Sequence, residues 1–231
     1  MTAFSLRLIA LISMLVDHTY VALLPEQTWM NCIGRLAFPI FAFQLTEGYR
    51  HTKDKKKYAT RLFLFALLSE IPFDLAAYGE PFFWDHQNIF WTLLIGLLLI
   101  WAVDRVFTRW QDSSIRFTAI LFIVIASLYV AVCLRVDYSL FGVLTIFAFY
   151  ILRSKSRITL TLCVLVLNAL MGSYRISVFG IRFPIQLIAT LSMIPICLYD
   201  GKQGCHSKAW SWFCYAFYPL HLLILSLLRL F

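Results

Sequence analysis

Apolar stretches about as long as a bilayer is thick recur from one end of this sequence to the other, separated by brief polar segments. A helix needs about 20 mostly apolar residues to cross the hydrocarbon core of a membrane. The 231 residues are 61% hydrophobic and only 14% charged, which leaves too little polar surface to cover a soluble globule. The sequence therefore predicts an all-α, polytopic bundle of transmembrane helices that forms one domain, residues 1–231, in a lipid bilayer.

The hydropathy pattern predicts nine helices, at 5–24, 29–49, 59–74, 88–105, 117–134, 139–152, 158–173, 183–199 and 209–229. Lysine and arginine are concentrated in alternate loops, around 50–61, 105–116, 153–157 and 202–208. By the positive-inside rule this bias places the N-terminus in the cytoplasm and the C-terminus outside, in a multi-pass protein of the inner membrane. The same loops account for the net charge of +8, so nucleic-acid binding is not indicated. The helices at 139–152 and 158–173 are short and are also compatible with tilted or re-entrant segments.

Three unusual polar residues, Arg7, Asp17 and His18, lie inside the first apolar stretch. A charged side chain near the centre of a membrane helix costs roughly 2.5 to 3.5 kcal/mol, so such residues usually face a polar interior and mark a pathway or a reaction centre. Eleven residues return a helix to nearly the same face, so Arg7 and His18 are expected on one stripe, roughly 16 Å apart along the axis. The sequence thus predicts function on this face of the first helix.

The second predicted helix supplies possible partners for these charges. If the first two helices form a hairpin about Pro25, His18 lies level with Arg35, and Arg7 lies level with Glu47. We therefore expect ion pairs between Arg7 and Glu47 and between Asp17 and Arg35. Both pairs are equally compatible with a purely architectural role, because polar contacts between helices also help membrane bundles to pack.

Other polar residues lie at or near the helix ends. Glu70 is followed by Pro72, whose missing N–H disturbs a helix, and this combination suggests a cavity. Asp74, the run 85–88 and the pair 137–138 lie at the predicted external ends. His86 is most simply a surface residue, and His221, near the midpoint of the last predicted helix, is most simply a helix-contact histidine. The six cysteines have no metal-site spacing, so neither a zinc site nor a disulfide framework is indicated.

Histidine suits proton transfer near neutral pH because its unperturbed pKa is about 6.5. In acyl transfer an amine or hydroxyl loses its proton as it attacks a carbonyl, and cationic or N–H donors stabilise the developing oxyanion. These requirements point to His18 as the general base, or as a transient acyl carrier. Asp17 or Glu70 would orient it, and Arg35 would stabilise the oxyanion or hold a carboxylate.

Five sequence blocks resemble the TraX family, named for the acetylase of conjugative F-pilin. In order along the chain they are GRLAFPIFAFQLTEGYRHT (34–52), LLSEIPFDLA (67–76), HQNIFWTLLIG (86–96), DYSLFGVL (137–144) and FYPLHLLIL (217–225). The first helix, with an arginine followed eleven residues later by a histidine, is also similar to the opening helix of membrane acyltransferases that O-acetylate sugars. The resemblance to the TraX family covers nearly the whole chain.

The resemblance implies an enzyme that takes acetyl-CoA from the cytoplasm and delivers the acetyl group to an amine or hydroxyl at or across the membrane. In that picture His18 is the catalytic histidine, and Arg7 lies on the side of the coenzyme, with Glu47, Arg50 and His51 nearby. The acceptor is open: a peptide N-terminus, a glycan or a lipid-linked head group. No metal ion is implied.

Two other classes of protein fit the same residues. In a proton-coupled transporter, the acids Asp17, Glu47 and Glu70 would relay protons with His18, and Arg35 would bind an anionic solute. In a non-catalytic assembly factor, the buried charges would serve packing alone. Binding of acetyl-CoA separates the first alternative from an acetyltransferase, because a transporter has no reason to bind this donor.

Overall fold

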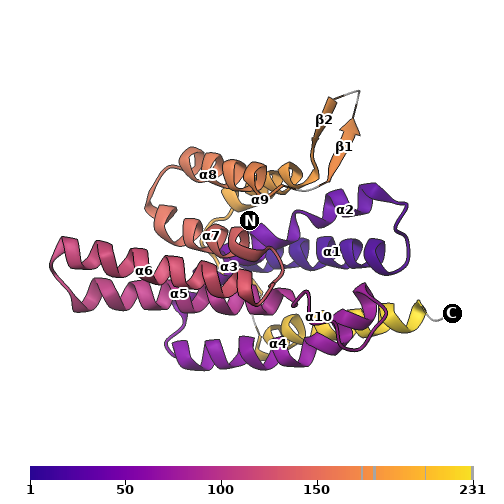
Figure 1. Ribbon diagram of the computed structural model, residues 1–231, viewed down its shortest axis with the longest axis horizontal. Helices are drawn as coiled ribbons and strands as arrows, with labels where there is room; N and C mark the ends of the chain where they lie inside the picture. Colours follow the sequence, from indigo (N-terminus) through magenta and orange to yellow (C-terminus); the bar gives the residue numbers. More distant parts are fainter. Residues whose placement is uncertain (173, 179–180, 206, 230–231) are drawn as a thin grey trace.

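The computed structural model describes residues 1–172, 174–178, 181–205 and 207–229, and helices make up most of it. The elements, in chain order, are α1 (Ala3–Ala22), α2 (Thr28–Gly34), α3 (Ala37–His51), α4 (Lys55–Ala77), α5 (Ile89–Arg109), α6 (Ser113–Cys133), α7 (Ser139–Ile151), η1 (Leu152–Ser154), α8 (Arg157–Leu170), β1 (Arg175–Val178), β2 (Ile181–Pro184), η2 (Ile185–Ser192), α9 (Met193–Cys197) and α10 (Lys208–Leu228). Figure 1 shows these helices packed roughly along the long axis of the molecule. The predicted all-α class is confirmed.

Polar residues begin several of the long helices by capping their free backbone N–H groups. Thr2 accepts a hydrogen bond from the Ser5 N–H at the start of α1, and Asp54 accepts one from Lys57 at the start of α4. Asn88 caps α5 in the same way. Such caps are worth about 1 kcal/mol each, and they fix where a helix begins after a short loop.

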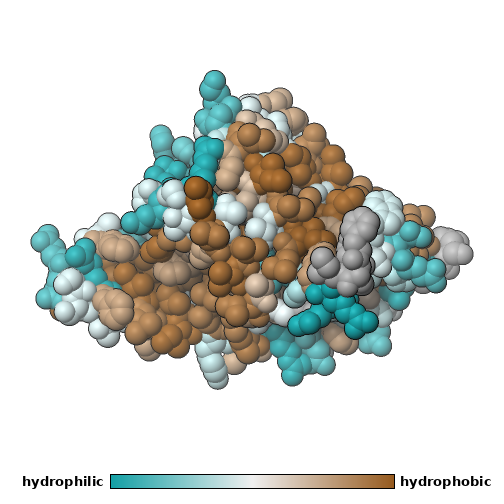
Figure 2. Space-filling model, turned by 90° about the horizontal axis from the view of Figure 1, so that it is seen from above, coloured by the Kyte–Doolittle hydropathy of each residue, from teal (hydrophilic) through white to brown (hydrophobic). Residues whose placement is uncertain are grey.

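Within the part of the chain that the structure describes, four helices are long and apolar enough to cross a membrane: Ala3–Ala22, Ile89–Arg109, Ser113–Cys133 and Ala209–Leu228. Helix α4 is as long as these but carries several charged residues. Helix α5 is central: 67% of the residues in its most apolar 18-residue stretch are buried, compared with 6% for α6. Apolar side chains dominate the face in Figure 2, and hydrophilic residues gather at its margins.

The second predicted helix, 29–49, is not continuous. It is divided into α2 and α3 by a turn at Arg35 and Leu36. Pro39 accounts for the break, because in a continuous helix its ring would clash with the carbonyl of Arg35, four residues earlier. With the helix restarted at Ala37, Pro39 lies in the first turn of α3, where a missing N–H is tolerated.

The structure differs from the prediction in the segment before residue 185 and refines it in the helix that follows. The segment expected as a loop forms an antiparallel hairpin, in which Arg175 pairs with Pro184 and Ile176 with Phe183. The helix expected at 183–199 is present at Ile185–Cys197, where it is divided into the 3-10 helix η2 and the short α9, and its first two expected residues belong to β2. Pro195 within α9 cannot donate a backbone hydrogen bond, which works against one long regular helix here. Ser173, the expected last residue of the seventh helix, lies outside the described residues.

Helices α1, α4 and α10 run in the same direction (Figure 1), and α10 packs against both of the others. Helices α2 and α3 return beside α1, and α5 packs against α3, α4, α6 and α7. This arrangement brings the C-terminal halves of α1, α4 and α10 together with the loops before α5 and α7.

Candidate functional site

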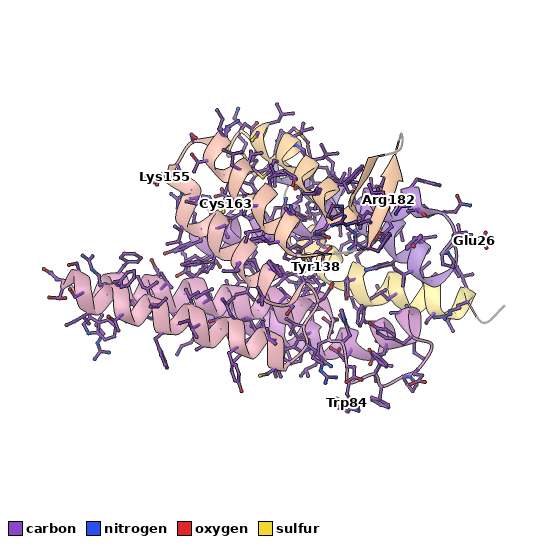
Figure 3. The ribbon with its side chains drawn as sticks, turned by 45° about the horizontal axis from the view of Figure 1, so that its top comes forward. Glu26, Trp84, Tyr138, Lys155, Cys163 and Arg182 are labelled. Atoms are coloured by element: carbon purple, nitrogen blue, oxygen red, sulfur yellow. The ribbon has the colours of Figure 1, made fainter. Side chains whose placement is uncertain are left out.

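A polar cavity of about 170 Å³ lies where these segments meet. It is lined by Asp17, His18, Val21, Arg35, Phe73, Ala76, Ala77, Tyr78, His86, Asp137, Tyr138 and Leu222. Figure 3 labels Tyr138, which marks the position of the cavity within the bundle. Three of the four residues predicted to be catalytic, Asp17, His18 and Arg35, therefore share one cavity.

His18 pairs with a second histidine, His221 of α10. The Nδ1 atom of His18 lies 2.6 Å from Nε2 of His221, and the two rings are stacked with centroids 4.9 Å apart. The Nδ1 atom of His221 lies 2.6 Å from the carbonyl oxygen of Phe217, one turn earlier in α10. A carbonyl oxygen only accepts, so Nδ1 of His221 must carry a hydrogen.

This contact assigns the tautomers of both neutral rings, as hydrogen-bond networks do for histidines in general. With its hydrogen on Nδ1, His221 accepts at Nε2, and His18 must donate from its own Nδ1. The Nε2 atom of His18 then carries the lone pair, and it has no hydrogen-bond partner among the described residues. His18 lines the cavity, and Nε2 is its ring nitrogen that is not engaged by another described residue.

Asp17 and Arg35 form the predicted ion pair. The Arg35 Nη2 atom lies 3.3 Å from Oδ1 of Asp17, and the Asn31 side chain donates to the same oxygen at 2.7 Å. The Tyr174 hydroxyl in turn donates to Asn31 at 2.6 Å. A Cβ atom at Gly34 would overlap the Asp17 side chain, so the absence of a side chain there makes room for the carboxylate. The break after α2 thus places Arg35 at the cavity.

The loop before α7 supplies the opposite wall. Tyr138 has a left-handed backbone, with φ of 59°, and its ring stacks on Phe38 with centroids 4.0 Å apart. Asp137 accepts from the Tyr138 N–H and lies 3.5 Å from Nε2 of His86. The hydrogen bond between His86 and the Asp137 carboxylate raises the pKa of His86 above its usual value. Non-glycine residues in left-handed conformations cost energy and often occur at functional sites.

Glu70 lies outside the cavity. Its carboxylate accepts hydrogen bonds from the Asn88 backbone N–H at 3.2 Å, from the Asn88 amide, and from the Trp91 indole N–H at 2.8 Å. These contacts tie α4 to the start of α5. The structure therefore does not place Glu70 where it would orient His18.

The four residues predicted to bind the coenzyme do not line the cavity. Arg7 precedes His18 by eleven residues in α1, roughly 16 Å along the helix axis. Its Nε atom donates to Gln44 at 3.3 Å, so the expected ion pair between Arg7 and Glu47 is not formed. Glu47 instead pairs with Arg50 at 2.8 Å and lies 3.9 Å from His51, both one turn further along α3.

The sequence reasoning undervalued three residues of the site. His221 was expected to be a packing histidine, and His86 a surface residue. Asp137 was noted only as one of several polar residues at helix ends. His86 and Asp137 lie beside predicted external helix ends, whereas His221 lies near the midpoint of the last predicted helix; in the structure the first two line the cavity and His221 pairs with His18.

Apolar helices of membrane-spanning length, with a polar cavity among their ends, define the chain as a membrane protein that holds a candidate site within its helix bundle. It belongs to the TraX protein family, whose model matches residues 4–229. The resemblance noted in the sequence is therefore confirmed.

Two relatives support this assignment. The chain is 27% identical over 244 residues to a protein of Dichelobacter nodosus described as a probable fimbrial assembly protein, FimC, with 100% of this chain and 96% of the relative covered. It is 28% identical over 113 residues to protein TraX of Escherichia coli, a match that covers 47% of this chain and 42% of the relative. No solved structure matches the chain.

Proposed function

We propose that this chain is a multi-pass inner-membrane acetyltransferase that moves an acetyl group from cytoplasmic acetyl-CoA to an amine or hydroxyl acceptor. The observation that carries the proposal is the histidine pair: His221 leaves Nε2 of His18 unprotonated at a cavity that also contains Arg35. The N-terminus is assigned to the cytoplasm from the distribution of basic loops, which puts the cavity toward the external ends of the helices.

In the proposed reaction, Nε2 of His18 accepts the proton of the acceptor amine or hydroxyl as that group attacks the thioester carbonyl. The carbonyl oxygen becomes an oxyanion, which the Arg35 guanidinium stabilises by charge and hydrogen bonding. When the carbon–sulfur bond breaks, the proton on His18 passes to the departing thiolate. Asp17 keeps Arg35 in place, and His221 fixes the ring of His18 so that the correct nitrogen faces the acceptor.

The nature of the acceptor is a further part of the proposal. The relative from Dichelobacter nodosus is described as a probable fimbrial assembly protein. That description supports a peptide acceptor in a protein subunit of a surface fibre, ahead of a glycan or a lipid-linked head group.

The test is release of free thiol from acetyl-CoA by the purified full-length protein, with peptides bearing a free N-terminal amine offered beside amino sugars. His18→Ala should lower the rate about 10² to 10⁴-fold, the usual contribution of a positioned general base. Glu26→Gln, in the exposed loop after α1, serves as a control and should retain the full rate. Full activity of His18→Ala would remove this residue from the mechanism.

A proton-coupled transporter is the second candidate, because the cavity is lined by two carboxylates and two histidines. The proton relay expected from the sequence is weakened, because Glu47 and Glu70 lie away from the cavity and do not continue a relay from Asp17. Stabilisation of the folded protein by acetyl-CoA would favour the acetyltransferase. Proton-linked solute uptake into proteoliposomes, with no effect of acetyl-CoA on melting, would favour the transporter.

A further inference from the structure

A second polar cluster lies on the helices that build the cavity, toward their N-terminal ends. Arg7 of α1 contacts the Cys214 thiol of α10 as well as Gln44. Arg61 of α4 lies against two aromatic rings, with its guanidinium carbon 5.6 Å from the ring centroid of Tyr58 and 5.8 Å from that of Tyr215. We call this the two-arginine cluster.

The cluster has positive charge without a matching carboxylate. Within the described part of the chain, neither Arg7 nor Arg61 forms an ion pair. The Nε atom of Arg61 and the indole nitrogen of Trp210, one turn before Cys214, are buried donors with no hydrogen-bond partner. A buried donor left unpaired costs about 1 to 3 kcal/mol, and more when it is charged. The Arg61 guanidinium hydrogen-bonds the Tyr215 side chain, but its Nε atom and the Trp210 indole nitrogen are left for a further acceptor, which an anion would supply.

We propose that the two-arginine cluster binds the phosphate groups of an organic phosphate, which on the function proposed above are those of the acyl donor. Guanidinium groups suit phosphate because their N–H groups match two phosphate oxygens at once. Arg7 and Arg61 both act on Tyr58 and Tyr215, so the two cations lie close enough together to serve a ligand that carries several phosphate oxygens. The rings of Tyr58 and Tyr215 contact the Arg61 guanidinium and hold it in position.

The spacing between the cluster and the residues at the cavity is nearly the same on all three helices. Arg7 precedes His18 by eleven residues, Trp210 precedes His221 by eleven, and Arg61 precedes Phe73 by twelve. The three helices run in one direction, so the two sites are separated by roughly 16 to 18 Å along the bundle. A molecule with phosphates at one end and a thioester at the other would be held by the cluster while its acyl group reached His18.

The experiment measures binding of coenzyme A to the full-length protein, with pantetheine as the matched probe that lacks the phosphates. Arg61→Gln should weaken coenzyme A binding about tenfold to a hundredfold, as expected for the loss of charge-assisted hydrogen bonds. Its turnover of S-acetylpantetheine should equal that of the wild type. Trp210→Phe, which keeps the ring and removes the donor, should show a smaller loss. Lys57→Gln removes an exposed charge one turn before Arg61 and should change binding by less than about twofold.

Equal weakening by Lys57→Gln and Arg61→Gln would overturn the proposal, because it would show a diffuse charge effect. A lipid head group is the other source of the same phosphate chemistry. If Arg61→Gln leaves coenzyme A binding intact but reduces the phosphatidylglycerol retained from mixed-lipid nanodiscs, the cluster binds lipid and the assignment to the donor is wrong. Weaker coenzyme A binding by Arg61→Gln without any acetyl transfer by the wild type would refute the enzyme and retain the site. Acetyl transfer that depends on His18, together with unchanged coenzyme A binding by Arg61→Gln, would retain the enzyme and refute the phosphate site.

Discussion

Replacement of Asp17 by asparagine tests the electrostatic structure of the cavity most directly. The substitution keeps the shape of the side chain but removes the charge that faces Arg35 at 3.3 Å. It also replaces one acceptor oxygen with an amide that donates, beside the Asn31 donor at 2.7 Å. Arg35 would then be a largely buried cation with no ion-pair partner within the described residues.

The expected cost follows from the burial of the pair. Removing one partner of a buried ion pair typically costs about 3 to 5 kcal/mol. The Arg35 and Asp17 side chains are 20% and 16% exposed, so we expect the lower end of that range, about 3 kcal/mol. For a chain of this length, that corresponds to a fall in the melting temperature of about 6 to 12 °C. Arg35→Gln should have a similar effect, for the complementary reason.

The assay is thermal unfolding of each variant in the same detergent and at the same scan rate, followed by tryptophan fluorescence. The double variant Asp17→Asn with Arg35→Gln should be clearly more stable than the sum of the two single losses predicts, with a coupling of about 0.5 to 3 kcal/mol. Strictly additive losses would refute the reasoning, because they would mean that the two side chains do not stabilise each other.

Two further predictions concern the walls of the cavity. Gly34→Ala should destabilise the protein by about 1 to 3 kcal/mol, because its Cβ overlaps Asp17; Gly48→Ala, which meets only the tip of the Tyr58 ring, is the control and should melt near the wild type. His86→Gln should lower the melting temperature more in acid than in alkali. The pKa of His86 is raised by its hydrogen bond to the Asp137 carboxylate, so its contribution to stability is complete below its unfolded pKa of about 6.5 and is lost as pH rises through the folded value. A loss that grows with pH would contradict this assignment.

The long apolar helices followed from the sequence because their signals are local. Hydropathy and capping residues such as Asp54 and Asn88 are read within a few positions of each helix start. The break after α2 had a local signal too, in Pro39, but the apolar run around it favoured one helix. The hairpin at 175–184 was missed because a strand of four residues leaves too short an alternation to outweigh the surrounding apolar pattern.

The ion pairs were predicted by matching residues of the first two helices at equal distances from the turn at Pro25. This matching gave the correct partner only close to the turn. Asp17 and Arg35 lie close to the connection between α1 and α2, so a small error in register shifts them little, and their ion pair formed as predicted. Arg7 and Glu47 lie much farther from that turn, and the break at Arg35 changes the path of α3 between the two positions. Arg7 consequently meets Gln44 instead of Glu47.

The histidine pair depends on a contact between residues 203 positions apart, for which a single sequence carries no direct signal. Its local part is contained in α10, where His221 reaches back one turn to the carbonyl of Phe217. That bond alone leaves the second ring nitrogen of His221 as an acceptor at the helix surface. Once α10 packs against α1, this nitrogen acquires a donor in Nδ1 of His18, which leaves the lone pair of His18 on Nε2. His221→Asn replaces the ring by a shorter amide, which cannot span from the Phe217 carbonyl to Nδ1 of His18 as the imidazole does. The rate of acetyl transfer that remains in this variant therefore measures how far His18 depends on His221 for its tautomer.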